Sequence, residues 1–104
     1  MTLSDLQTML VTIVPGIKHY WIMGHGQAYT YWEETRRLPL MADDRHIEEG
    51  WVFYVHHFTR DESDTVPGTL FAGLDGKPNV TVSWEVTYEQ DTGYIHHIFS
   101  CEVV

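Results

Sequence analysis

The side chains best suited to chemistry in this chain are its histidines. Seven occur in 104 residues, and four of them form the adjacent pairs His56-His57 and His96-His97. Imidazole is a common zinc ligand, so the pairs raise the hypothesis of a metal site. Adjacent side chains on a strand point to opposite faces, however, so neither pair can hold one ion through both rings. A site would need one histidine from each strand, with His57 and His97 meeting only if their strands were neighbours.

Other routes to catalysis have less support. Cys101 is the single cysteine, and it lies about 13 Å along an extended strand from His97, too far to share a zinc ion. We interpret Cys101 as a small core residue. Adjacent carboxylates resemble acid/base dyads only in composition, since catalysis would require burial. The chain has no CxxC, HxH, HExxH or GxSxG spacing. We therefore predict a protein that is not an enzyme, with no catalytic residue, cofactor or metal.

The charge balance excludes further classes. Six Lys and Arg residues against fifteen Asp and Glu residues give a formal net charge of −9, which would repel a phosphate backbone. The apolar run Met9-Leu10-Val11 is interrupted by Thr12, so neither a secretory signal nor a membrane span is predicted. We expect no nucleic-acid partner and no membrane partner.

Two helices are predicted. Residues 3–14 have an apolar stripe at three- and four-residue spacing, formed by Leu3, Leu6, Leu10, Ile13 and Val14. Thr2 with Asp5, or Ser4 with Gln7, offers a capping box, and Pro15-Gly16 ends the helix. A shorter helix is predicted around residues 70–74, weakened by Gly68 and Gly73 at roughly 1 kcal/mol each.

The strands are predicted at residues 17–23, 28–34, 51–59, 80–88 and 95–103. Between residues 80 and 88 the apolar side chains alternate with polar ones, which indicates one face in the core and one in water. The last two strands should form an antiparallel hairpin. We predict a single domain over residues 1–104 with an α+β fold of order α-β-β-β-α-β-β. Both helices would pack on one face of a mainly antiparallel sheet of about four to five strands.

The segment from Arg36 to Gly50 is predicted to be a long charged loop. A connection of about sixteen residues far exceeds the usual hairpin loop, and long loops in small domains commonly serve binding. We expect the loop to change conformation or order on assembly. The candidate interface residues are Arg36, Arg37, Met41, Asp43, Asp44, Arg45, Glu48 and Glu49.

Aromatic side chains are more numerous than one small core needs. They are Tyr20, Trp21, Tyr29, Tyr31, Trp32, Trp51, Tyr54, Tyr88 and Tyr94. An excess of Tyr and Trp is typical of protein interfaces. The alternative is that the two faces of the sheet absorb them.

Several motifs together resemble a known family. They are Tyr29-Thr30-Tyr31-Trp32-Glu33-Glu34, Met41-Ala42-Asp43-Asp44, Glu48-Glu49-Gly50, Trp51-Val52-Phe53-Tyr54-Val55 and Trp84-Glu85 with Tyr88. In this order, and after an amphipathic helix, they resemble the small tail-completion (tail-to-head joining) proteins of long-tailed bacteriophages and prophages. The short, glycine-containing second helix and the many histidines depart from the family pattern.

The resemblance implies a virion structural protein without catalysis, which caps the end of the tail tube and docks to the neck of the head. Its partners would be other copies of itself, in a ring of about six with heterologous interfaces, and other neck or tail proteins. It would occupy the host cytoplasm before assembly and the virion tail or neck afterwards. The alternatives are a small metal- or ligand-binding protein that uses the strand histidines, and a host adaptor domain.

Overall fold

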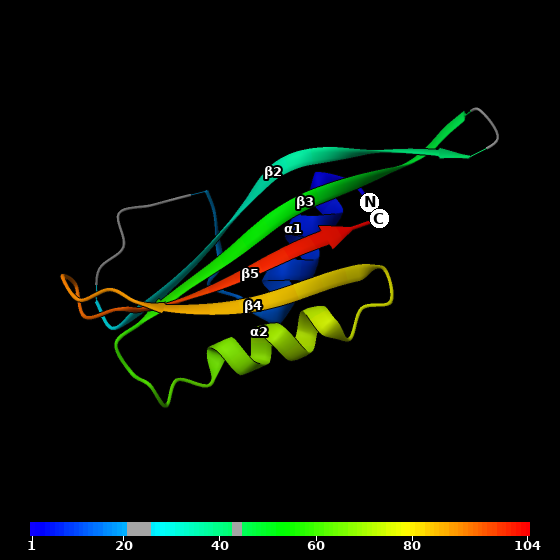
Figure 1. The fold of residues 1–104 in the computed structure, drawn as a ribbon. Helices are drawn as coiled ribbons and strands as arrows, with labels where there is room; N and C mark the ends of the chain where they lie inside the picture. Colours follow the sequence, from blue (N-terminus) through cyan, green and yellow to red (C-terminus); the bar gives the residue numbers. More distant parts are fainter. Residues whose placement is uncertain (21–25, 43–44) are drawn as a thin grey trace.

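The chain folds into two helices and a five-stranded sheet (Figure 1). The computed structural model describes residues 1–20, 26–42 and 45–104, with the backbone alone at 39–42 and 45–49. The elements are α1 (Leu3–Ile13), β1 (Lys18–His19), β2 (Ala28–Ala42), β3 (Arg45–Thr59), α2 (Val66–Asp75), β4 (Val80–Tyr88) and β5 (Ile95–Val103). The sheet order is β1-β2-β3-β5-β4. Among the described strands, β1 and β2 pair in parallel and the other three pairs are antiparallel. The predicted α+β fold, its element order and the β4–β5 hairpin are confirmed.

Both helices begin at residues that satisfy their first amide groups. At α1 the Thr2 side chain accepts a hydrogen bond from the Asp5 amide (3.0 Å), and the Asp5 carboxylate accepts one from the Thr2 amide (3.2 Å), which forms the capping box. At α2 the Asp64 carboxylate accepts a hydrogen bond from the Val66 amide (2.9 Å). Pro67 then occupies the first turn, where its missing N–H costs nothing.

One hydrophobic core holds the helices against the sheet. Leu6 and Leu10 of α1 and Leu70 and Leu74 of α2 are fully buried. They pack with side chains of the sheet, namely Trp32, Phe53, Val55, Val80, Phe99, Cys101 and Val103. We call this side of the sheet the helix face and the opposite side the helix-free face. The interpretation of Cys101 as a core residue is confirmed, and burial raises the pKa of its thiol to about 12.

The two glycines of α2 differ in their surroundings, which gives a testable contrast. A Cβ at Gly73 would lie 2.9 Å from the Ile13 side chain of α1, whereas one at Gly68 would meet open space. We expect Gly73→Ala to lower the free energy of unfolding by about 1 kcal/mol, because overpacking outweighs the gain in helix propensity. Gly68→Ala should raise it by up to about 1 kcal/mol. Urea unfolding measures both, and two stabilising substitutions would contradict the close packing of α1 on α2.

The predicted first strand is shorter than its sequence pattern suggests. Of the described residues in this segment, 17–20, only Lys18 and His19 form strand pairs with β2. Tyr20 has a positive φ of 70°, a conformation that extended backbone cannot accommodate, so the strand ends there. Residues 21–23 of the predicted strand, and residues 24–25 of the turn predicted after it, lie outside the described residues.

The predicted long loop at residues 36–50 is wrong, because the two strands continue through it. β2 runs to Ala42 and β3 starts at Arg45, and Leu38 pairs with Gly50, Leu40 with Glu48 and Ala42 with Arg45. β5 ends at Val103 opposite Trp51, so beyond this point β3 has only β2 beside it. We call residues 38–50 the arm. The inward backbone groups of each strand pair with the other strand. A ribbon without a core needs no alternation of apolar and polar side chains, so a sequence that joins the apolar run 38–42 to the largely charged residues 43–49 resembled a loop.

The predicted core face of β4 is also wrong over most of its length. Val80 is buried and Val82 partly so, but Trp84 is 38% exposed, Val86 57% and Tyr88 60%. β4 is the last strand of the sheet, and its second half extends past the start of α2 (Figure 1). We call Trp84, Val86 and Tyr88 the β4 stripe.

Candidate protein interface and the histidine networks

Four of the eight predicted interface residues lie in the arm and two lie at its base. Arg36 and Arg37 are exposed on β2 at its base. The backbone of Met41, Arg45, Glu48 and Glu49 lies within the arm, whereas Asp43 and Asp44 lie outside the described residues. The arm projects beyond the rest of the sheet (Figure 1) in a molecule that measures 50 × 25 × 22 Å. The expected change of conformation on assembly was based on a long loop. Because the segment is a paired ribbon, that reason no longer applies.

A β-bulge sets the direction of the side chains at the base of the arm. The register of β2 against β3 shifts between Glu34 and Arg36, and the Thr35 hydroxyl donates a hydrogen bond to the Val52 carbonyl (3.1 Å). A bulge bends a strand and increases its twist. After the bulge Arg36 is opposite Val52 on the helix-free face, and Arg37 is opposite Trp51 on the helix face.

Trp84 of the β4 stripe lines a cleft beside α2. The cleft has a volume of about 600 Å³, and Trp84 and His97 form its wall from the sheet. Its other lining residues come from the α2 region, namely Glu62, Asp64, Thr65, Pro67, Gly68, Thr69 and Ala72. The alternating sequence could not reveal this surface, because the same pattern describes a buried strand face.

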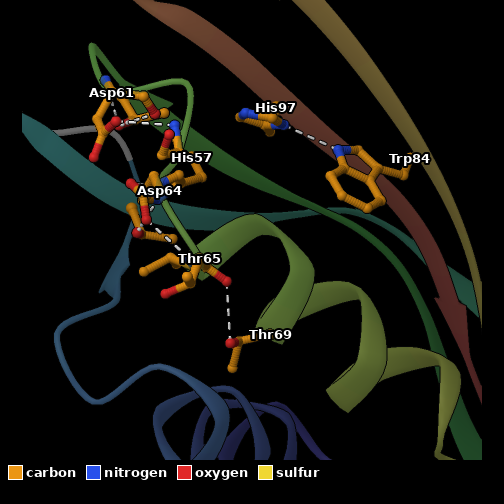
Figure 2. A network of polar contacts seen from close by, with 11 residues as sticks. His57, Asp61, Asp64, Thr65, Thr69, Trp84 and His97 are labelled. Atoms are coloured by element: carbon orange, nitrogen blue, oxygen red, sulfur yellow. Dashed lines mark hydrogen bonds and ion pairs between the residues drawn. The ribbon is translucent and has the colours of Figure 1, made fainter.

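A buried histidine connects the sheet to the start of α2 (Figure 2). His57 is 2% exposed, and its ring nitrogens lie 2.7 Å from the Thr30 hydroxyl and 2.8 Å from the Asp64 carboxylate. Burial raises the pKa of Asp64, but the hydrogen bonds from His57 and the Val66 amide outweigh this effect and the net pKa is lowered. An ionised carboxylate only accepts, so Nε2 of His57 donates to Asp64 and, in the neutral ring, Nδ1 accepts from Thr30.

Thr30, His57 and Asp64 are hydrogen-bonded in the same sequence as the nucleophile, base and acid of a catalytic triad. Thr30, in the nucleophile's position, is only 8% exposed and is not among the residues that line the cleft. What the contacts do support is a structural link between β2, β3 and the first turn of α2. The sequence analysis did not single out Asp64, because it is one of several polar residues in the segment 61–65 between β3 and α2.

His57 and His97 do converge, as paired neighbours on β3 and β5. Their ring centroids are 6.2 Å apart, and Trp84 Nε1 donates a hydrogen bond to His97 Nδ1 (3.0 Å; Figure 2). Burial and the neighbouring His57 lower the pKa of His97. Within the part of the chain that the structure describes, no group of three or more His, Cys, Asp or Glu side chains is placed to hold a metal ion.

The second histidine pair lies on the helix-free face. A hydrogen bond of 2.9 Å joins His56 Nδ1 and His96 Nε2. Tyr31 stacks on His56 and Phe58 on His96, with centroid distances of 4.6 and 4.0 Å. Burial lowers the pKa of both histidines, and for His96 the nearby His56 adds to the effect and brings the pKa to about 4. The aromatic cluster therefore encloses imidazoles that are neutral at pH 7.

The His56–His96 pair predicts a loss of stability on acidification that begins above the range where carboxylates titrate. The pKa of His96 is about 4 when folded against an ordinary value of 6.5, so as pH falls through this window the unfolded chain binds the proton first. The free energy of unfolding should fall by on the order of 2 kcal/mol between pH 6.5 and 4. Urea unfolding at several pH values measures the loss. His96→Gln should reduce the dependence of the free energy of unfolding on pH in this range. If the variant lost as much stability as the unchanged protein, other groups would cause the acid sensitivity.

Comparison of the chain with protein family models and with curated protein sequences finds no match. Among the described residues, no helix has the length and apolar character needed to cross a membrane.

Proposed function

We propose that this protein is a tail-completion subunit of a long-tailed bacteriophage or prophage, which caps the end of the tail tube and docks to the neck of the head. It acts as a structural part of the virion and not as a catalyst. The sequence motifs that resemble this family support the proposal, and so does the arm, the observation on which it chiefly depends.

The arm is a feature that assembly would explain. Residues 38–50 extend beyond Val103, the end of β5, so that β2 and β3 pair only with each other there. An isolated two-stranded ribbon is at best marginally stable in water. A ribbon of this kind gains stability when another protein covers one of its faces or edges, and a neck or tail protein would provide that surface.

The surface away from the arm also suits assembly. The β4 stripe exposes two aromatic rings and a valine on an edge strand, and exposed apolar patches of this kind mark protein interaction sites. The net charge of −9 would keep free subunits apart in the host cytoplasm until specific contacts form. In the virion, a ring of about six copies would use different patches on the two sides of each subunit.

Gold-labelled antibody against this protein, applied to purified particles from the strain that encodes it, tests the proposal. We expect label at the junction between head and tail. A matched preparation from a strain in which the gene is disrupted controls for unspecific labelling. Label absent from all particles, or spread over the capsid, would contradict the proposal.

A further inference from the structure

We propose that the outer edge of β4 in one copy of this chain pairs with the outer edge of β2 in the next copy, which joins their sheets head to tail. The inference rests on the proposed function, because it names the contact by which subunits of the ring would meet. It adds which strands pair, in which direction, and which side chains meet.

The sheet offers two edges with unused pairing capacity. Among the described residues, β4 is the last strand in the order, and β1 pairs with β2 at Tyr31 and Trp32, where the Tyr20 amide also donates a hydrogen bond to the Trp32 carbonyl (2.7 Å). From Glu33 to Leu38, among the described residues, no strand pairs with the outer side of β2. Open strand edges of this kind readily add a strand from another chain.

The directions of the two edges agree with antiparallel pairing. β2, β3, β5 and β4 are each antiparallel to the next, so β2 and β4 of one chain run in opposite directions. When a second copy continues the sheet in the same orientation, its β2 therefore lies antiparallel to the first copy's β4. Each copy keeps its other edge open, so the contact is heterologous and can repeat around a ring.

Charge on the two edges is complementary. Glu85 is exposed on the helix-free face of β4, and Arg36 is exposed on the helix-free face of β2. In a continuous sheet the helix-free faces of both copies coincide, so these opposite charges come to the same side. The β2 carboxylates lie before the bulge, Glu33 near His56 (3.5 Å) and Glu34 with His19 (2.8 Å), whereas Arg36 and Arg37 lie after it.

The helix face is complementary in a different way. Arg37 and the β4 stripe both lie on this face, where a guanidinium can stack on Trp84. A symmetric contact between two copies of β4 would instead bring two acidic edges together. The head-to-tail contact is favoured because it matches the basic part of β2 after the bulge with an acidic and aromatic strand.

Cysteine cross-linking between two variants tests the pairing. Arg36→Cys and Glu85→Cys are purified separately and then mixed under mild oxidation. Cys101 gives no background, since it is buried with a raised pKa. We expect a disulfide-linked dimer in the mixture and none in either variant alone.

Asp75→Cys, an exposed position at the end of α2, serves as the matched control with Arg36→Cys and should not cross-link. The double variant Arg36→Cys/Glu85→Cys should give a ladder of linked chains that ends at one closed size.

Two results would overturn the inference. One is a homodimer of Glu85→Cys without the mixed product, which would show that β4 pairs with itself. The other is the absence of the mixed product both in the free protein and in purified particles. The outcomes also separate the interface from the function. Mixed cross-links without antibody label at the neck would support the β4–β2 interface and contradict the proposed function. Label at the neck without cross-links would contradict only the interface.

Discussion

Replacement of residues 39–49 by the turn Asn-Gly should leave a folded subunit that no longer assembles. Leu38 and Gly50 already face each other across the ribbon, so a short turn can close it there. No described residue of the arm belongs to the hydrophobic core, so the free energy of unfolding should change by less than about 1 kcal/mol. Joined particles should fall to the level of a strain without the gene. Urea unfolding and electron microscopy measure the two effects.

A matched control for the arm variant is Glu62→Ser, an exposed change in the segment between β3 and α2. It should affect neither stability nor assembly. If particles joined normally with the shortened chain, the arm would have no part in docking, and the main observation behind the proposed function would be lost.

Trp32→Ala should be the most destabilising single substitution among those considered. Trp32 is fully buried, its ring stacks on His19 at 3.9 Å, and its Nε1 donates a hydrogen bond to Gln7 of α1 (2.8 Å). Truncation of a buried Trp costs about 3–5 kcal/mol, a large share of the roughly 5–15 kcal/mol that stabilises a small domain. Urea unfolding should show the midpoint moving far toward zero denaturant.

Two controls separate packing from hydrogen bonding at Trp32. Trp32→Phe keeps an aromatic ring beside His19 and loses the bond to Gln7, so it should cost less than the alanine change. Tyr88→Ala removes an aromatic ring that is 60% exposed and should cost less than about 1 kcal/mol. Equal losses at Trp32 and Tyr88 would show that the core is not where the structure places it.

Local patterns in the sequence predicted most of the fold. The stripe from Leu3 to Val14 and the box of Thr2 and Asp5 predicted α1, because periodicity and capping are properties of neighbouring residues. The alternation in residues 80–88 predicted β4 and its hairpin with β5 for the same reason. The element order and fold class followed from these patterns, and the structure confirms both.

The parts that failed depend on what surrounds each strand. The alternation at Trp84, Val86 and Tyr88 indicates a strand with one apolar face, but it does not show whether a helix covers that face. In the structure α2 leaves these residues exposed. The segment from Arg36 to Gly50 lacks alternation because the arm has no core to face, although its backbone pairs throughout the described residues. Pairing between strands is a non-local property, and a segment without alternating side chains gives no local signal of it.

The histidine networks show the same limit at the level of single side chains. The sequence predicted that adjacent histidines face opposite sides, and His57 and His56 do so in separate contacts. The approach of Asp64 to His57 and of His96 to His56 depends on the β3–β5 register and on the start of α2. No spacing rule within the chain encodes these distances.

Disruption of the gene in the strain that encodes it tests the proposed tail-completion role most directly. We predict that filled heads and free tails then accumulate separately, and that purified protein added to this lysate restores joined, infectious particles. The protein without residues 39–49 should fail to restore them. Normal joined particles from the disrupted strain, or a gene with no head and tail genes around it, would contradict the account.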